Sequence, residues 1–142
     1  MNSVPDCRAS AGAPGSLAEP KLDGLRVLVV EDSFLIATSV SRMLAELGCR
    51  VVGPVGTVQE AIPLVESGAC DVGVLDINLG PAQTSEPVAG SLTRRRLPFF
   101  FITGYASPSV LSAEFKPFPK VHKPVTSLAL KSAMLRAILG EN

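Results

Sequence analysis

The chain of 142 residues contains no tryptophan, one tyrosine and one histidine, and its formal net charge is zero. A balanced charge gives no general attraction to nucleic acid or to an anionic membrane surface, so we expect neither as a partner. The three cysteines do not have the spacing of a zinc site. Because their number is odd and small, it is typical of a reducing compartment, and we expect a cytoplasmic protein.

Long hydrophobic runs are also absent. No segment reaches the roughly 18 uncharged apolar residues of a membrane-spanning helix, so membrane insertion is not expected. Residues 1–23 contain several prolines and glycines without apolar periodicity, and they lack the basic start and apolar stretch of a signal peptide. We expect a disordered leader at 1–23. Residues 24–142 then suit one domain, since a hydrophobic content of 46% for the whole chain supports a packed core.

The sequence does contain a regular alternation of apolar runs and amphipathic stretches. Runs rich in β-branched or aromatic residues predict strands at 25–32, 50–53, 72–79, 98–104 and 119–124. Helical signals follow each strand, at 33–48, 57–67, 87–96, 107–115 and 126–139. The helix at 107–115 should be short or mobile, because the prolines after it prevent its continuation. The alternation predicts an α/β fold with a doubly wound, five-stranded parallel sheet and about five helices.

The third predicted strand carries one carboxylate, Asp76, to the rim of the predicted core. A charge in that position is costly unless a partner neutralises it or the chemistry uses it. Three other predicted strands also end in polar residues: Glu31 and Asp32 after the first, Thr103 after the fourth and Lys123 after the fifth. If the strands are parallel, these ends share one edge of the sheet, where open α/β sheets bind ligands.

These residue types suit phosphoryl transfer to a carboxylate. Three carboxylates within a few ångströms repel one another, which raises their pKa values unless a cation joins them. Mg²⁺ is suited to that place, because it prefers carboxylate oxygens and retained waters and shares its other positions with phosphate. An aspartate can attack phosphorus to form an acyl phosphate. A lysine and a threonine can then neutralise and hydrogen-bond the phosphoryl oxygens.

The acid pair, Asp76, Thr103 and the sequence Lys123-Pro124, in that order, make the chain resemble a bacterial response-regulator receiver domain over about residues 24–139. The resemblance implies a flavodoxin-like sheet with the strand order 2-1-3-4-5. It also implies that Asp76 accepts a phosphoryl group, with Lys123 as its counter-ion and Thr103 as a switch hydroxyl. The implied Mg²⁺ ligands are Glu31, Asp32, Asp76 and the backbone carbonyl of Asn78.

A narrower resemblance concerns residues 98–105, which read Pro-Phe-Phe-Phe-Ile-Thr-Gly-Tyr. They are similar to the single-domain FATGUY group, which is named after its Phe-Ala-Thr-Gly-Tyr motif. Here Ile102 replaces the usual alanine, and Glu86 stands where that group often has an aromatic residue. Receivers commonly carry an aromatic residue three positions before the lysine, where this chain has Lys120. Tyr105 is a candidate to report the switch in its place, with simple packing as the alternative.

The resemblance implies a single-domain response regulator of a two-component phosphorelay and not a classical enzyme. Its expected partners are a sensor histidine kinase or a histidine phosphotransfer protein, and a downstream protein that receives the signal. A role as a phosphate sink stays open. A phosphate-independent adaptor with the same fold is one alternative. A phosphatase of the haloacid-dehalogenase type is another, but those enzymes have a second aspartate two residues after the nucleophile, where this chain has Asn78.

Overall fold

The computed structural model describes residues 22–81, 83–104 and 111–140. These residues form one five-stranded sheet in the order β3-β2-β4-β5-β6, and every neighbouring pair of strands is parallel. The strands are β2 (Arg26–Val30), β3 (Arg50–Val55), β4 (Val72–Asp76), β5 (Phe99–Thr103) and β6 (Lys120–His122). Numbered along the chain, this is the predicted order 2-1-3-4-5, so the predicted sheet is confirmed.

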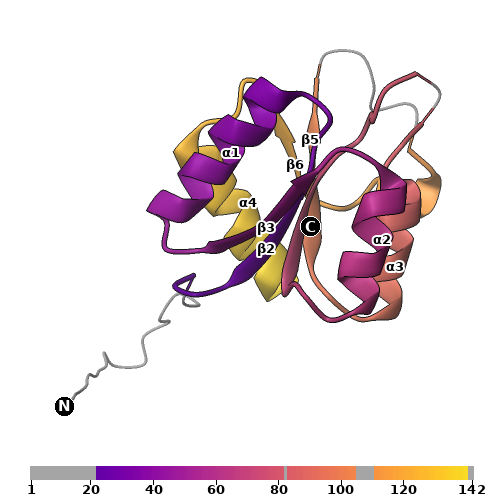
Figure 1. Ribbon diagram of the computed structural model, residues 1–142, viewed down its shortest axis with the longest axis horizontal. Helices are drawn as coiled ribbons and strands as arrows, with labels where there is room; N and C mark the ends of the chain where they lie inside the picture. The colour runs from indigo at the N-terminus through magenta and orange to yellow at the C-terminus, as the bar shows by residue number, and fades with distance from the viewer. Residues whose placement is uncertain (1–21, 82, 105–110, 141–142) are drawn as a thin grey trace.

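Within the described ranges, four α-helices cover the two faces of the sheet (Figure 1). They are α1 (Phe34–Glu46), α2 (Val58–Glu66), α3 (Glu86–Arg94) and α4 (Ser127–Leu139). Helices α1 and α4 lie on one face, and α2 and α3 lie on the other. Each pair encloses its own apolar cluster against the sheet, and every residue of the central strand β4 is buried between the two clusters.

Local signals in the sequence set the helix starts. The hydroxyl of Ser33 accepts a hydrogen bond from the Ile36 N–H and caps α1. At α2 the Thr57 hydroxyl accepts from the Glu60 N–H, while the Glu60 carboxylate accepts from the Gly56 N–H and the Thr57 hydroxyl. This is the capping interaction that the spacing of Thr57 and Glu60 predicts.

Two elements differ from the prediction. Strand β3 continues to Val55, past the expected end at residue 53, and its pairing with β2 shifts register between Leu28 and Val30. A strand at the edge of a sheet tolerates Pro54, because the missing N–H faces away from the ladder. In place of the expected helix at 107–115, the described residues contain a short 3₁₀ turn, η2 (Ala113–Phe115).

Some predictions lie outside the described residues. They are residues 1–21 of the leader expected at 1–23, the first part of the expected fourth helix, and the role of Tyr105. Leu22, within the expected leader, is 8% exposed and packs in the apolar cluster beneath α1 and α4. Within the described part of the chain, no helix is long and apolar enough to cross a membrane.

Candidate functional site

The predicted site residues meet at the carboxyl edge of the sheet. Asp76 is the last residue of β4, and Glu31 and Asp32 directly follow β2, the strand beside it. Val30 pairs in register with Leu75, so the chain after β2 leaves the sheet level with the end of β4. Lys123 directly follows β6, and its N–H donates to the Thr103 carbonyl at 2.9 Å. The parallel topology therefore brings all five residues to one edge.

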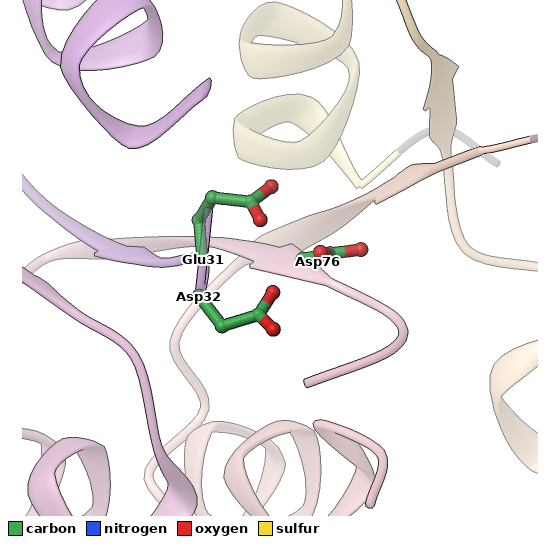
Figure 2. Close-up of side chains that lie close together, drawn as sticks. All are labelled: Glu31, Asp32 and Asp76. Carbon is green, nitrogen blue, oxygen red and sulfur yellow. The ribbon is translucent and has the colours of Figure 1, made fainter. Parts of the chain in front are cut away.

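Three carboxylates form a cluster at this edge (Figure 2). One oxygen from each of Glu31, Asp32 and Asp76 lies within 4.8 Å of the others. Glu31 is 3% exposed and Asp76 is 4% exposed, whereas Asp32 lies open to solvent. Two acids of the cluster, Glu31 and Asp76, are thus buried, and the third, Asp32, is accessible to solvent.

Lys123 provides the positive charge that opposes this cluster. Its Nζ lies 3.2 Å from Glu31 Oε1 and 3.2 Å from Asp76 Oδ2. Partial burial lowers the pKa of the Lys123 ammonium, but attraction to Asp76 and Glu31 outweighs that effect and leaves the pKa raised. Lys123 therefore stays charged and holds the two buried carboxylates on one side.

The ion pair with Lys123 does not keep the pKa of Glu31 at its usual value. Burial raises the pKa of Glu31 to about 7, and the neighbouring Asp76 adds to the shift, whereas the Ser33 N–H and Lys123 oppose it. Its Oε2 accepts a hydrogen bond from the Ser33 N–H at 3.0 Å, whereas its Oε1 faces Lys123 Nζ at 3.2 Å in an ion pair that lacks good hydrogen-bond geometry. A buried carboxylate oxygen with an incomplete shell beside two further acids is suited to a hard cation.

Two glycines lie close to Asp32 in the loops that follow β3 and β4. Gly80 has a φ of +98°, and a Cβ on it would lie 3.8 Å from Asp32 Oδ2. A Cβ on Gly56 would lie 3.5 Å from the Asp32 Cα. Sequence reasoning missed both glycines, although each stands in the connection that follows a predicted strand. The donor set of Glu31, Asp32 and Asp76 therefore fits Mg²⁺.

Asn78 and Thr103 are the two remaining predicted site residues, and each makes a short-range hydrogen bond at this edge. The Asn78 N–H donates to Asp76 Oδ1 at 3.3 Å, which orients the carboxylate, and the ligand role of its carbonyl stays a prediction. Thr103 is 1% exposed, and its hydroxyl donates to the Gly104 carbonyl at 3.1 Å. In this state the Thr103 hydroxyl is thus bonded to its own chain, and its switch role also stays a prediction.

An apolar groove adjoins the site. It encloses about 370 Å³ and is lined by Leu35, Ile36, Ser39, Val40, Lys123, Pro124 and Val125. Leucine side chains on α1 and α4 add exposed apolar surface, since Leu35 and Leu128 are each 79% exposed, as does Phe34 at 80%. Lys123, which contacts Asp76, therefore also lines the apolar groove.

A parallel sheet of this order, with an acid cluster opposed by a lysine at its carboxyl edge, defines the receiver class of signalling domain. The solution structure of SdrG from Sphingomonas melonis matches with a TM-score of 0.73 and 36% identity, over 81% of this chain and 97% of that one. SdrG has also been solved in a BeF3-activated conformation. The signal receiver domain of a modulated diguanylate cyclase from Desulfovibrio desulfuricans matches with a TM-score of 0.74 and 29% identity, over 83% of this chain and 96% of that one.

Among curated proteins, the transcriptional regulatory protein PdtaR of Mycobacterium tuberculosis is 32% identical over 57% of this chain. The match spans 40% of the length of PdtaR. No family model matches the sequence. The likeness to SdrG along nearly its whole length, together with the receiver-domain structures, establishes the family: the chain belongs to the response-regulator receiver domains of two-component systems.

Proposed function

We propose that this protein is a phosphorylated response regulator that receives its phosphoryl group on Asp76. The observation that carries this proposal is the single spot at which Asp76 meets Lys123 on one side and the Glu31-Asp32 pair on the other. The BeF3-activated form of SdrG supports it, because beryllofluoride on a carboxylate imitates a phosphoryl group. We assign the receiver unit to residues 24–142, and the sequence at 98–105 supports placement in the FATGUY group.

The reaction is a displacement at phosphorus. A carboxylate oxygen of Asp76 attacks the phosphorus of a phosphohistidine, and a P–O bond forms while the P–N bond breaks. The imidazole nitrogen leaves with the electron pair of that bond and takes up a proton from solvent. Lys123 already lies 3.2 Å from Asp76 Oδ2, so it neutralises charge on the transferred oxygens without a large movement.

Glu31, Asp32 and Asp76 are the residues that would hold Mg²⁺, with the Asn78 carbonyl as a further ligand. When bound, the ion supplies positive charge to the phosphoryl oxygens. Glu31 contributes a buried carboxylate on a fixed backbone, since its N–H donates to the Val55 carbonyl at 2.9 Å. Thr103 contributes a hydroxyl that can exchange the Gly104 carbonyl for a phosphoryl oxygen.

The phosphoryl donor must bring its histidine within bonding distance of Asp76. The apolar groove includes Lys123, whose Nζ contacts Asp76, and it is also lined by Leu35, which is 79% exposed. A hydrophobic surface of this kind favours a protein donor over a small molecule. We therefore assign the groove to the histidine kinase or histidine phosphotransfer protein, and the output to a separate downstream protein.

The other hypotheses predict different behaviour. A phosphate-independent adaptor would have no use for Mg²⁺, so isothermal titration that detects no binding of Mg²⁺ would favour it. A phosphatase would turn over a generic phosphate ester. In the structures to which this chain is similar along nearly their whole length, the matching unit is SdrG or a signal receiver domain, which supports the response-regulator proposal.

Labelling with acetyl phosphate tests the proposal directly. In the presence of Mg²⁺, the native protein should gain one acid-labile phosphoryl group, measured by intact mass spectrometry, because Asp76 displaces acetate from phosphorus. Asp76→Asn should abolish the gain, since the amide is a far weaker nucleophile. Asp71→Asn is the matched control and should be labelled normally, because Asp71 precedes β4 and lies at the opposite edge of the sheet. Undiminished labelling of the Asp76→Asn protein would refute the assignment.

A further inference from the structure

One peptide group beside the acid pair, Glu31 and Asp32, is hydrogen-bonded on both of its sides. It joins Val55, the last residue of β3, to Gly56. Its carbonyl accepts from the Glu31 N–H at 2.9 Å, and its N–H donates to Glu60 Oε1 at 3.2 Å. Because a peptide group is planar, its carbonyl and its N–H turn together. The orientation of this plane therefore links the Glu31 backbone to the Glu60 carboxylate.

A bulge in β3 brings this peptide to the end of β2. The register of the two strands shifts between Leu28 and Val30, where β3 has one residue more than β2. Gly53 lies in this part of β3 with a φ of +93°, and a Cβ on it would lie 2.9 Å from the Val55 nitrogen. Val55 pairs with Val30 as a result, so its carbonyl lies level with Glu31, the first residue after β2.

The same peptide lies close to the second member of the acid pair. A Cβ on Gly56 would lie 3.5 Å from the Asp32 Cα and 3.9 Å from the Glu31 carbonyl oxygen, which are ordinary contact distances. Both side chains of the pair extend from this backbone into the carboxylate cluster (Figure 2). A rotation of the 55–56 peptide would therefore disturb two of the three carboxylates that we assign to Mg²⁺.

Glu60 holds this peptide from the side of α2. Gly56 has the backbone freedom of glycine, so the plane before it rotates readily unless hydrogen bonds hold it. The Glu60 carboxylate accepts a charge-assisted bond from the N–H, which also polarises the carbonyl that faces Glu31. Glu60 is itself fixed at the start of α2, because its N–H donates to the Thr57 hydroxyl and its Oε1 accepts from that hydroxyl.

From these contacts we infer that Glu60 is a positioning residue, which acts through the 55–56 peptide to hold the acid pair in the arrangement that binds Mg²⁺. The inference rests on the proposed binding of Mg²⁺ by the acid cluster. Glu60 is not among the carboxylates that converge there, so its effect on the ion is indirect. Groups that orient metal ligands raise metal affinity, because ligands already in place lose less freedom on binding.

Titration with Mg²⁺ alone, followed by backbone amide chemical shifts, measures the affinity. Glu60→Ala should raise the Kd for Mg²⁺ about tenfold, the lower end of the range for residues that support metal ligands. Glu60→Gln should bind Mg²⁺ nearly as well as native protein, because the glutamine oxygen accepts the same hydrogen bond. If Glu60→Gln lost as much affinity as Glu60→Ala, the charge and not the hydrogen bond would be responsible, and the inference would be wrong.

Glu60→Asp gives the complementary change. It keeps the charge but shortens the side chain by one methylene, so the carboxylate no longer reaches the Gly56 N–H. This variant should also weaken Mg²⁺ binding, and it replaces Glu60→Ala if that protein fails to fold. Native affinity in both variants would overturn the inference.

Two further readouts separate positioning from a purely structural role in α2. Hydrogen exchange at the Glu31 amide, measured without Mg²⁺, should be faster in Glu60→Ala than in native protein, because the acceptor plane is no longer held. With acetyl phosphate, Glu60→Ala should be labelled more slowly than native protein at limiting Mg²⁺ and at the native rate at saturating Mg²⁺. Unchanged exchange at Glu31 would refute the link through the peptide.

Thr57→Ala is the matched comparison. It removes the hydroxyl that caps α2 but keeps the bond between Glu60 and the Gly56 N–H. It should therefore unfold at a lower urea concentration than native protein while its affinity for Mg²⁺ stays close to the native value. Equal losses of affinity in Thr57→Ala and Glu60→Ala would assign the effect to the helix start and overturn the inference.

The outcomes distinguish this inference from the proposed function. If native protein binds Mg²⁺ and is phosphorylated while Glu60→Ala keeps the native Kd, the positioning role is overturned and the proposed function stands. If native protein binds no Mg²⁺, both fall together.

Discussion

Lys123 and Glu31 determine what the site can do at the scale of single residues. A carboxylate that is 3% exposed would be strongly unfavourable without a partner, and the lysine 3.2 Å away supplies one. The same lysine contacts Asp76, so two buried acids share one cation. One lysine balances only part of the negative charge of the three acids, so the cluster still attracts a second cation. This charge is consistent with a site that combines Mg²⁺ with a phosphoryl group.

Asp71 offers a residue-scale test of electrostatics away from the site. Its oxygens accept three hydrogen bonds from Arg26, two from the guanidinium and one from the backbone N–H. The side-chain hydrogen bond from Arg26 is the main reason why the pKa of Asp71 is lowered. Because the pKa of Asp71 is lower in the folded state than in the unfolded chain, the pair stabilises the protein at pH values above the unfolded pKa, which is about 4 for aspartate. That contribution is lost as the pH falls through the folded pKa.

Asp71→Asn should therefore unfold at a lower urea concentration than native protein at pH 7, and the difference should shrink as the pH falls below about 4. The effect should be small, because the side chains of Arg26 and Asp71 are 42% and 37% exposed and solvent screens the pair. Urea titrations of both proteins at several pH values make the measurement. A difference that stays constant down to acid pH would contradict this account.

Close packing between β4 and α3 is the main constraint at the scale of elements. Gly73 lies in the middle of β4, and a Cβ on it would lie 2.6 Å from Leu92 Cδ1 and 3.4 Å from Phe99 Cβ. Leu92 is fully buried, so its Cδ1 could shift only by displacing neighbouring core side chains. The absence of a side chain at Gly73 is what allows Leu92 of α3 to approach β4 this closely.

Gly73→Ala should lower the free energy of unfolding by about 1–3 kcal/mol, the usual cost of overpacking a core. Gly90→Ala is the matched control on the neighbouring helix. A Cβ there would meet Arg94 Nη1 at 3.7 Å, an ordinary contact. That variant should gain up to about 1 kcal/mol, because alanine favours a helix more than glycine does. Chemical denaturation of both variants makes the comparison, and equal effects would refute the packing explanation.

The apolar surface around Leu35 connects the site to a partner at the scale of the whole molecule. Helices α1 and α4 lie on the same face of the sheet (Figure 1). Leu35 in the first turn of α1 lines the groove that includes Lys123, and the first turn of α4 carries a second exposed leucine, Leu128. The exposed leucine that lines the groove makes this face the surface that we assign to the phosphoryl donor.

Leu35→Glu should reduce phosphotransfer from any histidine kinase or phosphotransfer protein that labels the native protein, by about tenfold or more, since a charge enters the centre of an apolar contact. Labelling by acetyl phosphate should be unchanged, because this small donor does not need the groove. Leu139→Glu is the control, as it alters an apolar residue that is 57% exposed at the far end of α4. If labelling by the protein donor and by acetyl phosphate fell equally, the substitution would have impaired the reaction at Asp76, and the groove would not be the donor's binding site.

The sequence by itself determined the order of the elements, the type of each one except the segment before β6, and the edge at which Asp76 meets the acid pair and Lys123. Hydrophobic period and helix caps are local, and parallel strands place their carboxyl ends together, so these features needed no long-range information. Tertiary structure alone decided the contact of the 55–56 peptide with Glu31, the glycines around Asp32 and the groove beside Lys123. Each of them depends on the distance between residues far apart in the chain, and that distance follows from how the strands pair and how closely the helices pack on the sheet.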